Sequence, residues 1–300
     1  MRYWLLYIFL CTGCLANNTF AQEKNTNDNI DVVKITSHGD SLYAIGNYYE
    51  AALSFDQAAF FSVSASDKAS LFLKMSGALK QLADYESAER ALAVIDFIKL
   101  SDSLRFVVKY EAAFCAYLCG NFTKAELHLE ELNYSLSDSA VIVNSYLLYT
   151  LILNEQAKWT EAKKYLTSFI NKSSRFSDSL KPFMLGEVNS LYSKTNLPKL
   201  KNVIKAGNLS KILPGLGQMY AGYFWEGAGS FMFNITTLGL TVAGIYYHYY
   251  ITSVMFGFAT FERFYIGNTH RAELLAKKTN YKRKKTYNEK LKNYVLPYFN

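Results

Sequence analysis

Glycine residues gather in one stretch of this 300-residue chain, LPGLGQMYAGYFWEG at positions 213–227, where phosphate binding is the first chemistry to consider. A phosphate loop of the Walker type places lysine directly after its second glycine, so that the ammonium group neutralises phosphate. Here Tyr223 follows Gly222. A dinucleotide-binding loop needs a third glycine, which would stand at Tyr220, and a preceding strand that the sequence does not indicate. Both spacings exclude phosphate binding by this stretch.

Histidine and cysteine form no catalytic or metal-binding pattern. The four histidines are His38, His128, His248 and His270, and no metalloprotease helix, nucleophile elbow or catalytic cysteine–histidine arrangement occurs. Cys115 and Cys119 share one face of an expected helix, where a disulfide would be strained, so they are expected to be small apolar core residues. We therefore expect no enzyme activity, no metal and no cofactor.

The net charge of +7 comes from one segment. Nine lysines and arginines lie between Arg271 and Lys292 against Glu273 and Glu289, which gives 9 − 2 = +7, so the rest of the chain is close to neutral. This basic tail, residues 269–300, is expected to be a solvated or lipid-facing helix. Nucleic acid is not expected as a partner, because the N-terminus predicts export.

The first 21 residues are predicted to be a signal peptide. Arg2 precedes the apolar run Leu5 to Leu10, and small residues surround a cleavage position after Ala21. An alternative processing is lipidation of Cys14, which follows a motif similar to a lipoprotein box. Residues 22–31 are expected to be a linker.

An internal repeat follows this linker. Three kinds of residue recur every 37 positions: Gly46, Ala83, Gly120 and Ala157; Tyr48, Tyr85, Phe122 and Trp159; and Ala51, Ala88, Ala125 and Ala162. The small residue suits a tight, left-handed turn between two helices, the aromatic residue fills the gap between them, and the alanine permits their close approach. Ser-Asp pairs such as Ser66-Asp67 and Ser101-Asp102 are candidate N-caps of the intervening helices.

This small–x–aromatic–x–x–Ala pattern resembles the tetratricopeptide repeat family across about residues 32–170. The first helices match the family's small residue at Gly39, Ser76, Ala113 and, less well, Thr150. The period is longer than the family's usual one of about 34 residues, and the proline that commonly ends a repeat is absent. The resemblance implies stacked helix pairs in a right-handed solenoid, which binds proteins or peptides on its concave side. Separately, Ser177-Asp178 is a candidate cap of a closing helix at about Leu180 to Lys194. The groove positions that it implies are Asp40, Tyr43, Lys80, Gln81, Tyr110, Phe114, Tyr117 and Asn154.

The segment after the glycine-rich stretch is predicted to enter a membrane. Residues 227–247, GAGSFMFNITTLGLTVAGIYY, contain no charge over twenty-one positions, and a helix of this length spans the apolar core of a bilayer, about 30 Å. A second apolar run follows His248 and ends at Glu262-Arg263, which form either an ion pair at the membrane edge or two independent interfacial charges. A buried helical hairpin of a soluble domain is the alternative.

The stretch Pro214-Gly215-Leu216-Gly217-Gln218-Met219-Tyr220-Ala221-Gly222 resembles the opening of a family of small bacterial membrane domains with two transmembrane helices. That resemblance implies a short helix leading into the first span, and it brings no enzymatic activity. Met219 stands where the family has an aromatic residue, and the acidic–glycine pattern of some second spans is missing. The motif residues are Pro214, Gly215, Gly217, Gln218, Tyr220 and Gly222.

The sequence thus predicts an all-α chain, with a tetratricopeptide-like helical solenoid at residues 32–195 followed by a C-terminal transmembrane helical hairpin. A linker at 196–211 precedes the membrane domain, 212–268, and the basic tail. A hairpin returns the tail to the side of the repeats, whereas a single span would place it in the cytoplasm, which basic residues favour.

The expected function is that of an adaptor in the bacterial cell envelope, exported and anchored in the inner membrane with its repeats in the periplasm. Its partners would be a protein or peptide in the repeat groove and membrane lipids around the C-terminal segment. The alternative is a membrane-active component, for assembly, insertion or pore formation, whose repeats act as a docking arm.

Overall fold

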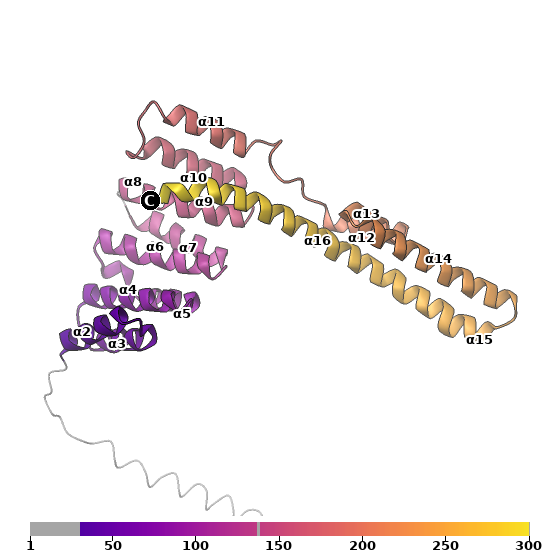
Figure 1. The fold of residues 1–300 in the computed structure, drawn as a ribbon, viewed down its shortest axis with the longest axis horizontal. Helices are drawn as coiled ribbons and strands as arrows, with labels where there is room; N and C mark the ends of the chain where they lie inside the picture. The colour runs from indigo at the N-terminus through magenta and orange to yellow at the C-terminus, as the bar shows by residue number, and fades with distance from the viewer. Residues whose placement is uncertain (1–30, 137–138, 300) are drawn as a thin grey trace, which may run out of the picture.

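The computed structural model describes residues 31–136 and 139–299 (Figure 1). Within these ranges every regular element is helical and no strand occurs, which confirms the all-α prediction. The predicted signal peptide, Cys14 and nearly all of the linker 22–31 lie outside the described residues. The helices form an array, α2 to α11, and a bundle, α12 to α16, whose last helix returns to the array.

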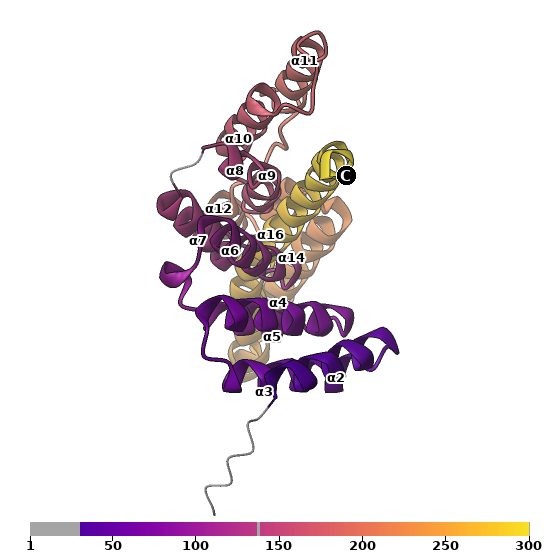
Figure 2. The same cartoon turned by 90° about the vertical axis from the view of Figure 1, so that its left-hand side faces the viewer.

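Helices of the array pair with their neighbours in sequence. The pairs are α2 (Val32–Ala44) with α3 (Tyr48–Phe61), α4 (Ala65–Gln81) with α5 (Tyr85–Ala93), α6 (Asp102–Leu118) with α7 (Phe122–Ser135), and α9 (Tyr146–Glu155) with α10 (Trp159–Lys172). The short elements η1 (Phe97–Lys99) and α8 (Ser139–Val143) lie between pairs, and α11 (Lys181–Leu191) packs on α10. The pairs stack in chain order, which gives a helical repeat-like architecture (Figures 1 and 2).

The recurring small residues lie in the turns that join the two helices of each pair. The backbone angle φ is +84° at Gly46, +58° at Ala83, +80° at Gly120 and +62° at Ala157. All four positions are therefore left-handed, as the sequence indicates. Glycine adopts this conformation freely, whereas alanine does so at a cost of about 1–2 kcal/mol.

The other columns form the contact between the paired helices. Each aromatic residue is the first residue of a second helix and is half-buried. The alanines of the repeat, Ala51, Ala88, Ala125 and Ala162, are all 0% exposed. In the first pair, a Cβ atom added to Gly39 would lie 2.8 Å from the ring of Phe55, so the approach of the two helices requires a small residue.

Of the two predicted caps of the helices within the repeats, Ser101 stands at the predicted position but makes no capping hydrogen bond, and Ser66 is not the cap. α6 begins directly after Ser101, as expected, although the Ser101 side chain makes no capping hydrogen bond. α4 is capped by Ser64, whose hydroxyl accepts a hydrogen bond from the Asp67 N–H at 3.4 Å. The expectation for Ser66 is wrong, because the helix begins at Ala65 and Ser66 lies inside its first turn.

The bundle contains a long pair of antiparallel helices. After α12 (Val203–Ile212) and α13 (Leu216–Ala221) comes α14 (Phe224–Tyr246), and then a rod made of α15 (Tyr250–Thr252), the π-helical η2 (Ser253–Phe258) and α16 (Ala259–Val295), which ends in η3 (Leu296–Phe299). Glu226 pairs with Arg271, and Phe233 lies 4.3 Å from Phe264 between ring centroids. Both pairs fit one antiparallel alignment, because a step of seven residues from Glu226 to Phe233 on α14 matches a step of seven residues from Arg271 back to Phe264 on α16.

α16 leaves the bundle and ends on the array. It has 37 residues, a length of about 55 Å. Near its end, Tyr287, Leu291 and Val295 are 8%, 0% and 0% exposed and belong to the core that residues of α6, α7, α9, α10 and α11 form. Figure 1 shows the end of α16 beside α9 and α10. The basic segment 269–300 is thus the distal part of a helix that begins in the bundle, and the segment 196–211 contains most of α12.

Candidate functional site

The predicted groove residues come from the first helix of each pair. They are Asp40 and Tyr43 on α2, Lys80 and Gln81 on α4, Tyr110, Phe114 and Tyr117 on α6, and Asn154 on α9. Of these, Asp40, Tyr43 and Gln81 are exposed, whereas Tyr117 and Asn154 are buried. The structure therefore divides the set into an open part on α2 and α4 and a covered part near the ends of α6 and α9. Tyr110 and Phe114, in the middle of α6, are half-buried between the two.

The open part carries charges that neutralise one another. The Asp40 carboxylate accepts hydrogen bonds from Lys74 Nζ at 2.7 Å. Lys80 Nζ lies 2.5 Å from the Glu111 carboxylate and 5.8 Å from the ring centroid of Phe114. This part of the surface therefore presents paired charges beside an aromatic ring.

Tyr110 lies next to this part and is held as a neutral hydroxyl. Its ring stacks on Phe106 with a centroid distance of 5.5 Å. Burial, and then the nearby Glu111 carboxylate, raise the pKa of Tyr110 to about 12. The side chain thus offers an apolar ring and one O–H group at neutral pH.

The covered part lies beneath the end of α16 and the residue that follows α11. Burial, with the Glu155 carboxylate nearby, raises the pKa of Tyr117 to about 12, and Lys292 Nζ of α16 lies 5.9 Å from its ring centroid. The Asn154 carbonyl oxygen accepts a hydrogen bond from the Tyr192 hydroxyl at 3.0 Å. A partner that reaches Tyr117 or Asn154 would have to displace α16 or Tyr192.

Polar contacts hold the end of α16 in this position. Trp159 Nε1 donates a hydrogen bond to Asn288 Oδ1 at 3.3 Å, and Asn288 Nδ2 donates to the Glu155 carboxylate at 3.1 Å. Arg175 donates to the backbone carbonyl of Tyr298 at 3.0 Å. Trp159, the aromatic residue of the fourth repeat, thus contacts a helix outside the repeats as well as those within them.

This contact was not predicted from the sequence, although the sequence contains a signal for it. Tyr287, Leu291 and Val295 are spaced by four residues and form an apolar stripe along one face of a basic helix. Such a stripe is the usual mark of a helix face that packs on a core.

The glycine-rich motif forms the turns around α13. Gly215 has φ = +93° before this helix and Gly222 has φ = +101° after it, whereas Pro214 is half-buried at the turn from α12. A Cβ atom added to Gly217 would overlap the backbone carbonyl of Ala206 in α12. These glycines therefore serve chain reversal and close packing of helices.

The other two motif residues fasten α13 to its neighbours. Gln218 is 1% exposed, and its Nε2 donates a hydrogen bond to Asn268 Oδ1 of α16 at 3.2 Å. The Tyr220 hydroxyl accepts a hydrogen bond from the Asn202 N–H at 3.2 Å, and Lys201 Nζ lies 4.6 Å from the Tyr220 ring centroid. The motif thus sets the geometry from which α14 begins.

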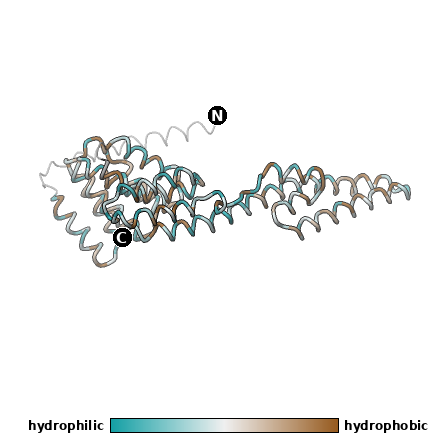
Figure 3. Tube along the Cα trace, turned by 90° about the horizontal axis from the view of Figure 1, so that it is seen from above, coloured by the Kyte–Doolittle hydropathy of each residue, from teal (hydrophilic) through white to brown (hydrophobic). Residues whose placement is uncertain are grey.

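The surface of α14 is apolar on the outside and polar within. Among the described residues it is the one helix that is long and apolar enough to cross a membrane. Met232, Leu240 and Val242 are 62%, 67% and 59% exposed, whereas Asn234 and Thr241, which face the rod, are 2% and 6% exposed. Hydrophobic residues follow both arms of this pair at the end away from the array (Figure 3).

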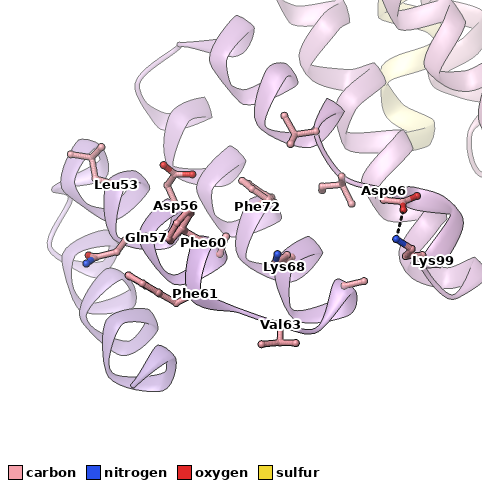
Figure 4. A pocket seen from close by; sticks show the side chains of 14 residues that line it. Leu53, Asp56, Gln57, Phe60, Phe61, Val63, Lys68, Phe72, Asp96 and Lys99 are labelled. Carbon is pink, nitrogen blue, oxygen red and sulfur yellow. Dashed lines mark ion pairs between the residues drawn. The ribbon is translucent and has the colours of Figure 1, made fainter. Parts of the chain in front are cut away.

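A surface pocket of about 840 Å³, separate from the predicted groove residues, lies between the ends of α3, α4 and α5 (Figure 4). Phe60 and Val63 line it and are 79% and 98% exposed. Its one ion pair joins Asp96 to Lys99 at 2.9 Å. These side chains provide apolar surface and balanced charge.

A buried carboxylate, Glu89 of α5, lies between second helices and is not one of the predicted groove residues. Glu89 is 3% exposed and accepts hydrogen bonds from Lys124 Nζ at 2.8 Å and His128 Nε2 at 2.9 Å. Burial acts to raise the pKa of Glu89, but these hydrogen bonds outweigh it and hold the pKa below its ordinary value. The cluster joins α5 to α7 and thus stabilises the stack.

Within the described part of the chain, no group of three His, Cys, Asp or Glu side chains is placed to hold a metal ion. Cys115 is buried and Cys119 is exposed, and both are free thiols. Comparisons with protein-family models, curated proteins and solved structures found no match for this chain. Two surfaces distinguish the molecule: the face formed by the first helices and the outward apolar surface of α14.

Proposed function

We propose that this protein is a membrane-anchored adaptor of the bacterial cell envelope. Its repeats, a tetratricopeptide-like solenoid, bind a protein partner, and a hairpin made of α14 and the rod crosses the inner membrane. The function involves no catalysis. The observation that carries the proposal is the outward apolar surface of α14 combined with its polar inner face.

This distribution supports a lipid environment for α14. A core helix of a soluble protein buries its apolar side chains, yet those of α14 point away from the protein. Their exposure to water would cost about 25 cal/mol for each Å² of apolar surface, whereas lipid removes this cost. Small and polar residues between the helices, such as Thr241 and Ser253, are typical of helix contacts within membranes.

The end of α16 supports two crossings rather than one. Asn288 and Tyr298 contact the array, whose last helix precedes the membrane segment in the chain. The two flanks of the membrane segment therefore lie on the same side of the bilayer. A single span would separate them and break these contacts.

Two features make opposite predictions about the side of the membrane on which the array lies. The predicted signal peptide supports a periplasmic array, because it exports the chain that follows it. The basic residues of α16 lie on the side of the array and favour the cytoplasm. We propose the periplasmic placement, since a signal peptide acts before the hairpin is made.

Reporter fusions test the topology. A reporter that is active only in the periplasm is fused after Thr195, at Asn300, and in a third chain at the turn near Tyr249. Activity at the first two positions and none at the third is expected. Opposite results at Thr195 and Asn300 would refute the hairpin, and activity at Tyr249 alone would place the array in the cytoplasm.

Capture experiments with the full-length chain test the binding face. Lys80→Glu, which reverses the charge facing Glu111, is expected to abolish capture of the partner that the wild-type chain retains. Tyr134→Ala is a matched control, because this α7 side chain is 96% exposed and does not belong to the groove set. Equal capture by Lys80→Glu and the wild type would contradict the assignment of this face.

A second candidate function is that of a membrane-active component with the repeats as a docking arm. It is favoured by buried amide atoms that lack partners among the described residues, Gln218 Oε1, Asn234 Oδ1 and Asn268 Nδ2. Such atoms gain hydrogen bonds if water enters the bundle. Ion leakage from vesicles that contain the wild-type protein, and its loss with Asn234→Leu, would support this function over the adaptor.

A further inference from the structure

Two charged residues interrupt the apolar surface of the membrane hairpin. Along the contact between α14 and the rod, Glu226 pairs with Arg271, and further along a Cβ added to Gly244 would meet the side chain of Ser253. The same register sets Arg263 level with the middle of α14, so the sequence-based expectation that Glu262 and Arg263 lie at the membrane edge is wrong for this hairpin. At 1.5 Å per residue, Arg263 lies about 12 Å from the level of Arg271 and about 20 Å from Tyr250 at the far end.

These two charges face outward from the protein. Glu262 and Arg263 are both exposed, and neither forms an ion pair with a described residue. Nearby, Phe258, Phe264 and Ile266 are 53%, 46% and 51% exposed, so the surface around the charges is apolar. Ionisable side chains within a membrane are costly unless they pair, and those that persist usually face a protein neighbour.

The face that carries Arg263 also permits another helix to come close. Ala259 and Gly267 lie four residues before and after Arg263, on the same stripe of α16. A Cβ atom added to Gly267 would meet no atom within 4 Å, so this glycine is not required by packing inside the chain. Small residues at such spacing are common where membrane helices associate.

We propose that Glu262 and Arg263 join two copies of this chain within the bilayer. A twofold axis along the membrane normal brings residues of equal depth together, so the carboxylate in each copy accepts hydrogen bonds from the guanidinium of the other. The second copy is the partner that fits, because this face carries both charges and is complementary to itself. The inference rests on the proposed membrane hairpin, and it places two arrays side by side.

Substitutions that reverse the charge of Glu262 or Arg263 test this contact between the two copies. Full-length chains with donor and acceptor fluorophores are reconstituted in vesicles, and energy transfer measures their association as the ratio of protein to lipid is varied. Glu262→Arg and Arg263→Glu, each alone, are expected to weaken self-association on the order of a hundredfold, because like charges then face each other in the membrane. A mixture of the two variants, and the double variant that exchanges the residues, are expected to associate as the wild type does.

The matched control exchanges Lys285 and Glu289 on the same helix, which are 61% and 60% exposed and lie beyond the bundle. It is expected to leave association unchanged. A wild-type chain that resists carbonate extraction but stays monomeric would overturn this inference alone. So would a mixture of variants that fails to recover association. A wild-type chain released by carbonate would overturn the proposed membrane function, and this inference with it.

Discussion

Replacement of Leu291 by alanine should release the end of α16 from the array while the array itself stays folded. Leu291 is 0% exposed and lies in the core with Tyr287 and Val295. Burial of such side chains contributes about 1.5–3 kcal/mol each, or about 5–9 kcal/mol for three before the cost of ordering the helix. Leu→Ala substitution in a core costs about 2–5 kcal/mol, so one substitution removes a large share of the docking free energy.

The fluorescence of Trp159 reports this docking. Its indole N–H donates to Asn288, and its ring meets Tyr287 edge-on with a centroid distance of 5.6 Å. In a Trp225→Phe background of the mature chain, urea should shift the Trp159 emission to longer wavelength at a lower concentration for Leu291→Ala than for the unsubstituted chain. The loss of helical circular dichroism from the array should occur at an unchanged concentration.

Leu127→Ala provides the control, because this α7 side chain is 50% exposed and distant in sequence from the contact. It should leave the Trp159 transition in place. Coincident Trp159 transitions for Leu291→Ala and the unsubstituted chain would refute this prediction. They would mean that Leu291 contributes nothing to the free energy with which the end of α16 docks on the array.

Three further substitutions test separate parts of the structure. Gly217→Ala should lower the melting temperature of the bundle in detergent because its Cβ would overlap α12, whereas Gly229→Ala, where the space is open, should not; equal melting would contradict the packing. Ala83→Gly should raise the free energy of unfolding of the array by about 1 kcal/mol, as urea titration measures, because φ there is +58°; a decrease would argue against strain. The lowered pKa of Glu89 means that its ionised form stabilises the array above the ordinary pKa of 4.5, and that this contribution is lost as pH falls through the folded-state value. Glu89→Gln should therefore be less stable than the wild type at neutral pH and approach it in acid; a difference that is constant with pH would exclude this linkage.

Features that depend on a few neighbouring residues were predictable from the sequence. The column of Gly46 and Ala83 indicated left-handed turns, and both residues have positive φ. Ala51 and its equivalents indicated close helix contact, and they are fully buried. Three residue types that recur at one period indicate one local structure, because each type has its own role there: the small residue permits the left-handed turn, the aromatic residue fills the gap between the helices, and the alanine permits their close approach.

Features that depend on distant segments were not predictable in this way. The charges of the basic segment indicated a solvated or lipid-facing helix, yet Tyr287 and Leu291 within it belong to the core of the array. The apolar stripe of Tyr287, Leu291 and Val295 indicates that this part of α16 packs on a core. It does not indicate which core, because α16 starts in the bundle and reaches the array only after many turns. The cap of α4 was misplaced for a smaller reason, since Ser64 and Ser66 both suit the position and only the path of the preceding loop selects Ser64.

The unbroken course of α16 has a mechanical consequence. Between Asn268 and Leu296 the sequence contains neither glycine nor proline, so the helix has no point at which it would readily bend. α16 is therefore a rigid connection: one end packs against α12, α13 and α14, and the other end packs against α9. The orientation of the array relative to the α14 hairpin is therefore fixed by this one helix, and a force applied to the array would be transmitted along α16 to the bundle.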